Sequence, residues 1–186
     1  MIPPLPLKTI CLCALASLIL SGCASPQGNF KTMKDPAYHG PPMNKVLIVS
    51  LNEDMASHLG RDFSNRLLTR INQSLSQRGV STEIAHQDKE ALDPMAPVKS
   101  AAARFHPQQL FYVAVTRVLS SNEEHPATIS GLPQFASEVS IAIAFSLTDV
   151  QSRKTIWRGE LQFSAVPAPE DVADQLIKQL ETEQLL

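Results

Sequence analysis

Cys23 is the residue of this chain best placed to act as a nucleophile. It follows Leu20, Ser21 and Gly22, and the small side chains of Ser21 and Gly22 leave room for another protein to approach the backbone beside the thiol. A thiol, as its thiolate, is the strongest nucleophile among the side chains. We therefore expect the clearest chemistry of this chain to be a covalent modification of Cys23.

The segment before Cys23 has the layout of a signal peptide. One cation, Lys8, precedes an apolar run over residues 9–20, and small residues follow the run. A helix of that length spans about 18 Å, which is well short of the ~30 Å hydrocarbon core of a membrane. We therefore expect a signal peptide over residues 1–22 rather than a spanning anchor.

The residues from Leu20 to Cys23, placed behind this apolar run, resemble the lipobox of bacterial lipoproteins. The resemblance implies that the Cys23 thiol carries diacylglycerol, that the signal is cut before Cys23, and that the new amino terminus is acylated. Three acyl chains would anchor the protein stably. By the same resemblance, Ala24 and Ser25 favour the outer membrane, with the domain facing the periplasm. The alternative is a cysteine that merely ends a soluble signal.

The other residue types that commonly support catalysis or metal binding do not form recognisable patterns. Cys11 and Cys13 lie in the expected signal peptide, so the processed chain would hold no free thiol and no disulfide. The five histidines are scattered singly, without the i, i+4 spacing of a zinc-binding helix, and no glycine-rich phosphate loop occurs. We therefore expect no catalytic residue, no metal and no cofactor, and a protein that is not an enzyme.

Two carboxylates keep an alternative function open. Glu53 and Asp54 follow the first buried strand that the pattern predicts, and the carboxyl ends of strands are common sites in α/β sheets. Together with the segment 120–137, they could form a periplasmic ligand-binding or weakly enzymatic site. The competing interpretation is that both carboxylates cap the helix that follows and complement its dipole.

The segment 120–137 is long for a hairpin connection and carries three apolar side chains, Ile129, Leu132 and Phe135. Loops of this length are uncommon in compact domains and are often functional. These three residues either fold back onto the sheet or form an exposed contact for a partner. We take them as the candidate binding residues.

Composition excludes one class of partner. The 186 residues carry a formal net charge of -2 and no run of Lys or Arg. Binding to nucleic acid would require clustered cations facing the phosphates. We therefore expect the partners to be the membrane, through Cys23, and an envelope protein, while association with further copies of the chain is left open.

Residues 23–44 are expected to be a flexible tether between the lipid and the domain. The stretch contains Pro26, Pro36, Pro41 and Pro42 and little apolar periodicity. Such a segment buries too little surface to offset the entropy of ordering it. The domain would then begin at Lys45 and extend to residue 186.

Two helices in the domain show an apolar stripe at intervals of three and four residues. The first has Gly79 as its stop signal, and the second begins after Pro167 with Glu170 and Asp171 in its first turn. A short Ala-rich helix is predicted over residues 98–105. The two stripes consist of Met55, Leu59, Phe63, Leu67, Leu68, Ile71 and Leu75, and of Val172, Ala173, Leu176, Ile177 and Leu180.

The strands follow from continuous or alternating apolar runs. They are predicted over residues 46–49, 80–85, 109–119 and 138–149, with a partner strand on which Trp157, Leu161 and Phe163 share a face. The last two strands should form an antiparallel hairpin. The order is β-α-β-α-β-β-β-α, which predicts a single α/β (α+β) domain with a mixed sheet and helices mainly on one face.

The apolar strand that leads into a long helix, and the hairpin around Asp149 and Trp157, resemble small envelope lipoproteins related to the TolB amino-terminal domain. Relatives include the curli secretion lipoprotein and the lipoprotein activators of penicillin-binding proteins. In the related hairpin a glycine usually occupies the turn, whereas Arg153 stands near that place here. The resemblance implies this fold and a function through binding, with no catalytic residues.

Overall fold

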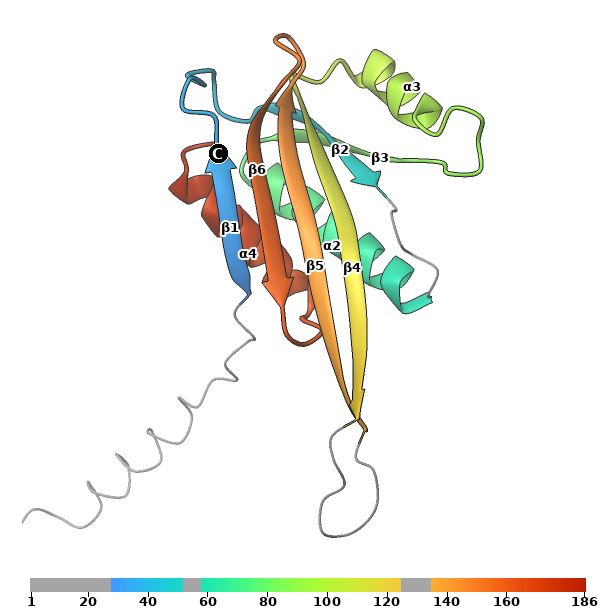
Figure 1. Ribbon diagram of the computed structural model, residues 1–186. Helices are drawn as coiled ribbons and strands as arrows, with labels where there is room; N and C mark the ends of the chain where they lie inside the picture. The colour runs from blue at the N-terminus through green and yellow to red at the C-terminus, as the bar shows by residue number, and fades with distance from the viewer. Residues whose placement is uncertain (1–27, 52–57, 125–134) are drawn as a thin grey trace, which may run out of the picture.

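The computed structural model describes residues 28–51, 58–124 and 135–186, with backbone alone at 58–60, 116–124 and 135–140. The expected fold class is confirmed: six strands form one mixed sheet in the order β1-β6-β5-β4-β2-β3, and three helices of the described chain pack on it (Figure 1). The predicted order of elements is present, with one additional strand before it. The elements are β1 (Asn29–Lys34), β2 (Lys45–Leu51), α2 (His58–Ser76), β3 (Ser81–His86), α3 (Ala96–Phe105), β4 (Gln109–Glu124), β5 (Phe135–Asp149), β6 (Lys154–Phe163) and α4 (Pro169–Thr182).

The sheet has a parallel part and an antiparallel part. Strand β2 pairs in parallel with both β3 and β4, as the crossovers through α2 and α3 require. Strands β4, β5, β6 and β1 pair antiparallel with their neighbours. The predicted hairpin of the last two strands is therefore confirmed, and β4 lies inside the sheet as expected.

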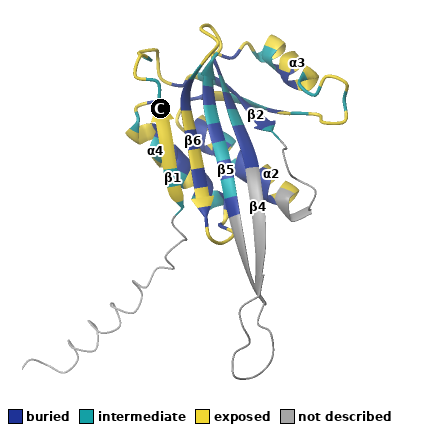
Figure 2. Cartoon of the chain, in the orientation of Figure 1, coloured by how far each residue is buried: buried dark blue, intermediate teal, exposed yellow. Residues whose placement is uncertain are grey.

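The main hydrophobic core lies between the sheet and the helices α2 and α4. Both predicted helical stripes face it wherever their side chains are described, and Leu67, Ile71, Leu176 and Leu180 are fully buried. Figure 2 shows β6 alternating between buried and exposed residues beside the largely exposed β1. Among the described residues, no helix is long and apolar enough to cross a membrane.

Helix α3 packs on the opposite face of the sheet, where it covers only the end formed by β2 and β3. Its residues Val98 and Ala101 form a second cluster with Leu47 and Val49 of β2 and Ala85 of β3. The contacts of α3 with other elements are to β3 and β2. Within the described chain, this face of β4, β5, β6 and β1 therefore has no helix over it (Figure 1).

The expectation of a flexible tether up to residue 44 is wrong for its described part. Residues 29–34 form β1 and pair with β6 from Asn29↔Gln162 to Lys34↔Trp157. The ring of Phe30 packs on the main core, as does the half-buried Tyr38. Further along, the N–H of the buried Met43 donates a 2.7 Å hydrogen bond to the carbonyl oxygen of Leu185. This segment is therefore ordered by backbone pairing with β6 and by a hydrogen bond to Leu185, which are contacts that its own sequence does not predict.

The segment 120–137 is also more regular than expected. Residues 120–124 continue β4 and residues 135–137 begin β5, with Glu124 paired to Phe135. In the described chain, residues 119–124 and 135–140 pair only with each other, so the two strands leave the sheet as a two-stranded arm (Figure 1). The connection predicted to span residues 120–137 is correspondingly shorter.

Candidate functional site

The uncovered half of the sheet carries two parallel rows of side chains that cross the strands. Strand pairing aligns Met33, Arg158, Ser146 and Tyr112 in one row. It aligns Lys31, Glu160, Ala144 and Ala114 in the next row on the same face. Because side chains alternate between the faces of a strand, the side chains between these rows lie on the opposite face, where Val113 and Phe145 enter the main core. The two rows therefore belong to one surface.

This surface is hollowed into a groove of about 470 Å³. Its centre is hollow because β4 and β5 present only the small side chains Ala114, Ala144 and Ser146 there. We call it the open-face groove, and its lining residues are Lys31, Thr32, Met33, Leu51, Tyr112, Ala114, Ala144, Phe145, Ser146, Arg158, Gly159 and Glu160. The volume lies within the range of pockets that hold small ligands or short segments of a partner.

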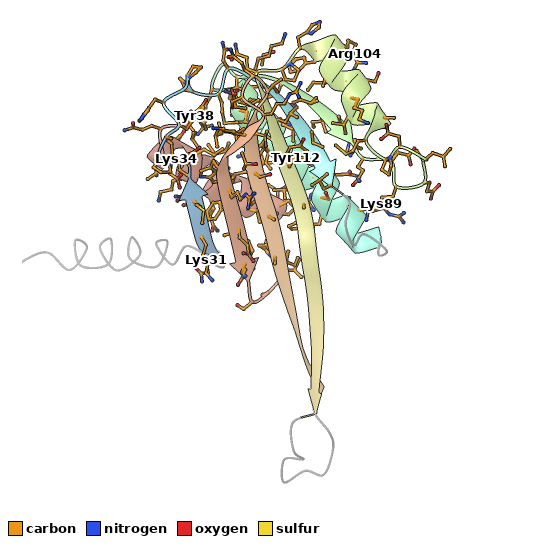
Figure 3. The ribbon with its side chains drawn as sticks, turned by 45° about the horizontal axis from the view of Figure 1, so that its top comes forward. Lys31, Lys34, Tyr38, Lys89, Arg104 and Tyr112 are labelled. Atoms are coloured by element: carbon orange, nitrogen blue, oxygen red, sulfur yellow. The ribbon has the colours of Figure 1, made fainter. Side chains whose placement is uncertain are left out.

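Longer side chains form the two sides of the open-face groove. On one side, the half-buried Tyr112 and Leu51 pack against the cluster beneath α3. On the other side lie Lys31 and Met33 of β1, and Met33 is 73% exposed. Figure 3 shows Lys31 and Tyr112 on separate strands of the uncovered sheet. Strand β1 therefore supplies one wall of the groove.

The groove holds polar groups that the protein itself does not use. Among the described residues, no hydrogen bond or ion pair engages the side chains of Lys31, Arg158, Ser146 or Tyr112. Glu160 accepts a 2.6 Å hydrogen bond from the side-chain amide of Gln162. Unused donors around a hollow are available to a ligand, because they lose only water when it binds.

Burial raises the pKa of the Tyr112 phenol above its usual range. The phenol is therefore protonated at neutral pH, where it can donate a hydrogen bond and cannot act as a base. Its neighbours in the row, Arg158 and Ser146, are donors as well. The arrangement is suited to holding an acceptor group over the small residues of the groove floor.

Comparison with known proteins gives distant likenesses only. No protein-family model matches this chain, and no curated protein matches it. It is similar to the PelC dodecamer from Paraburkholderia phytofirmans, with 16% identity, a TM-score of 0.48, and coverage of 83% of this chain and 95% of that one. It is also similar to lipoprotein GNA1162 from Neisseria meningitidis, with 14% identity, a TM-score of 0.44, and coverage of 75% and 96%. Likeness at this level carries no conclusion about function.

A second hollow, of about 370 Å³, lies between α2 and α4 on their solvent side. Its cations are already engaged: Arg66 pairs with Glu170 at 3.0 Å and Arg70 with Asp174 at 3.2 Å. The hydrogen bond and the charge of Glu170 raise the pKa of Arg66. A ligand there would compete with these ion pairs, so the open-face groove is the better candidate.

Most residues singled out from the sequence lie outside the described residues. This applies to Cys23, to Glu53 and Asp54, and to Ile129 and Leu132. Phe135 is the first residue of β5, where it pairs with Glu124. The structure therefore leaves the lipidation site and the apolar contact as predictions, and brings a different set of residues together.

The residues of the open-face groove were not predicted as a site from the sequence, although part of the signal was present. The alternation of β5 showed that Ala144 and Ser146 share the face opposite the apolar one, and β6 showed Arg158 and Glu160 opposite Trp157. That small and charged face was a usable signal that helices do not cover this part of the sheet. The missing information was β1, because the wall with Lys31 exists only after that strand pairs with β6.

Proposed function

We propose that this protein is a lipoprotein without enzymatic activity, anchored in the outer membrane through Cys23 after removal of residues 1–22. Its domain faces the periplasm and serves in assembly or maintenance of the cell envelope by binding a partner. The open-face groove is the binding surface. The lipobox-like segment supports the anchor, and the geometry of the sheet supports the binding surface.

One observation carries the binding function: a hollow on the uncovered sheet is lined by side chains with no partner in the described protein. Lys31, Arg158, Ser146 and Tyr112 could all donate to a ligand without breaking an internal contact. The protonated Tyr112 phenol suits recognition better than proton abstraction at neutral pH. Binding is therefore the task that these groups support best.

Strand β1 also bears on how the proposed anchor would hold the domain. Only about 20 Å of extended chain can separate Cys23 from Asn29. Asn29 pairs with Gln162, near the end of β6 and close to where the β4–β5 arm leaves the sheet (Figure 1). The anchor would thus hold the domain close to the membrane, with the arm at the membrane-facing end.

Lipid labelling in a Gram-negative host tests the anchor. Cells expressing the full chain are fed labelled palmitate, and the protein is followed by gel and by membrane fractionation. We expect label in the wild type and in the C13A variant, and loss of label and of outer-membrane fractionation in C23A. Equal labelling of C23A and wild type, or an unlabelled wild type, would refute the anchor.

A further inference from the structure

We propose that the open-face groove binds an acidic peptide segment, with a carboxylate held over Ser146 between Arg158 and Tyr112 and with apolar side chains against Met33 and Leu51. The inference rests on the proposed binding role of the groove and specifies its ligand. It does not require the lipid anchor.

The balance of donors and acceptors in the groove selects an anion. Arg158 carries five N–H donors and Lys31 three, and Ser146 and Tyr112 each add a hydroxyl. Glu160 is the one carboxylate among the lining residues, and it already accepts a bond from Gln162. The lining thus has two cations and one carboxylate, and its excess of positive charge complements an acidic ligand.

The row across the strands sets where a carboxylate would lie. Ser146 on β5 pairs with Arg158 on one side and with Tyr112 on the other. With strands about 4.8 Å apart, the backbones of Arg158 and Tyr112 are about 10 Å apart. A carboxylate above the small Ser146 could therefore accept charge-assisted hydrogen bonds from groups on three strands.

Four other arginines of the described chain do not offer this opportunity. Arg66, Arg70, Arg78 and Arg104 each pair with a carboxylate of a neighbouring helix or strand. A ligand at any of them would have to replace an existing ion pair. Arg158 has no such pair to lose, so it can contribute its full charge to an incoming acidic group.

The apolar part of the groove favours a peptide over a polysaccharide. Ala114 and Ala144 form the floor, and Met33 and Leu51 contribute apolar surface beside it. Alkyl side chains of a peptide gain from contact with this surface. The many hydroxyl groups of a sugar chain would lose water over the alanines without finding a hydrogen-bond partner.

Fluorescence anisotropy with the full lipidated chain in detergent micelles tests the ligand. The probes are a rhodamine-labelled peptide of alternating Leu and Glu, six residues long with a capped amino terminus, and the same peptide with Gln in place of Glu. We expect the Glu peptide to bind and the Gln peptide to bind at least about tenfold more weakly, the scale of a hydrogen bond to a charged group.

The matched variants are R158M in the groove and R66M on α2, both of which replace an exposed arginine with a neutral, unbranched side chain. We expect R158M to lower the affinity for the Glu peptide about tenfold or more, and R66M to change that affinity by less than about twofold. Circular dichroism of both variants checks that the fold is retained. An R158M effect no larger than that of R66M would overturn the proposal.

Three further outcomes would contradict the proposal that the groove binds an acidic peptide. These are equal affinity for the Glu and Gln peptides, binding of an oligogalacturonate in preference to the Glu peptide, and a dimer in light scattering that R158M dissociates. Failure of palmitate labelling would refute the anchor without touching these results. Conversely, a palmitate-labelled protein that does not bind the Glu peptide would support the anchor and refute the acidic peptide as the ligand.

Discussion

The ammonium group of Lys34 in β1 donates a 2.6 Å hydrogen bond to the carbonyl oxygen of Glu183, just after α4. The Glu183 carboxylate in turn accepts a 2.8 Å bond from the indole N–H of Trp157 in β6. Strand β1, the last helix and the neighbouring strand are thus tied together at one point. Residues 29–34, whose composition is typical of a linker, thus form an edge strand of the sheet and one wall of the open-face groove.

The contribution of β1 to stability can be measured with F30A. The ring of Phe30 lies 6.1 Å from that of Phe145 and 6.3 Å, edge-on, from that of Trp157. Removing this partly buried ring should lower the free energy of unfolding by about 2 kcal/mol in urea denaturation. The exposed control H39A should change it by less than about 0.5 kcal/mol. If F30A left the free energy of unfolding unchanged, β1 would not be part of the cooperative fold.

Gly159 is required by the close approach of an aromatic ring. A Cβ atom at this position would lie 2.5 Å from Cη2 of Trp157 and 2.9 Å from Cε2 of Phe30. We therefore expect G159A to cost about 1 to 3 kcal/mol and to shift the fluorescence of Trp157, the only tryptophan of the chain.

Gly79 provides the contrast to Gly159. It has φ of +82°, and a Cβ atom there would meet nothing within 4 Å. G79A should cost about 1 kcal/mol through backbone strain alone, with unchanged tryptophan emission. Identical emission spectra for G159A and the wild type would show that the ring does not constrain position 159.

Arg153 occupies a turn position better suited to glycine. Its φ is +58°, in the left-handed region that disfavours residues with a Cβ atom. We expect R153G to raise the free energy of unfolding by about 0.5 to 1 kcal/mol, whereas R153A, which also removes the charge, should give no gain. If R153A stabilises as much as R153G, the effect comes from charge and the conformational explanation fails.

The hairpin turn should also make stability depend on pH. Hydrogen bonds from the hydroxyl and the N–H of Ser152, both 2.6 Å, lower the pKa of Asp149 below its usual range. The ionised form is thus favoured in the folded state, so its stabilisation is present above the unfolded pKa of about 4 and is lost as pH falls through the folded pKa.

We expect D149N to be about 1 kcal/mol less stable than the wild type at pH 7, with the difference disappearing in acid. Urea denaturation from pH 7 to pH 2.5 measures it. The variant S152A should weaken the same pH dependence by removing the hydroxyl donor. A difference between D149N and wild type that stays constant across this pH range would contradict the role of the Asp149 charge.

The parts of the fold that could be predicted from the sequence are those whose pattern is local. The alternation that places Ile143 and Phe145 on one face, and the helical stripe that contains Leu176 and Leu180, are written in consecutive residues. All four side chains are buried as predicted. Periods of two and 3.6 residues need no knowledge of the partner element, because burial of one face imposes them on the strand or helix itself.

The parts that could not be predicted depend on pairing between distant segments. Residues 29–34 place a single large apolar ring, Phe30, on the core, so no periodicity marks them as a strand before β6 is present. Within the described residues, the arm of β4 and β5 beyond Val118 pairs only with itself, and this pairing joins residues that lie far from the rest of the sheet in the sequence pattern. The open-face groove requires the register of four strands, which no local pattern contains.

Site-specific photo-crosslinking in cells tests most directly the claim that this protein binds through the uncovered half of its sheet. Benzoylphenylalanine replaces either the exposed Met33 in the groove or the exposed Asp174 on α4. The account predicts a discrete adduct from position 33 that R158M abolishes, and none from position 174. An adduct from position 174 alone, or one from position 33 that R158M leaves unchanged, would contradict it.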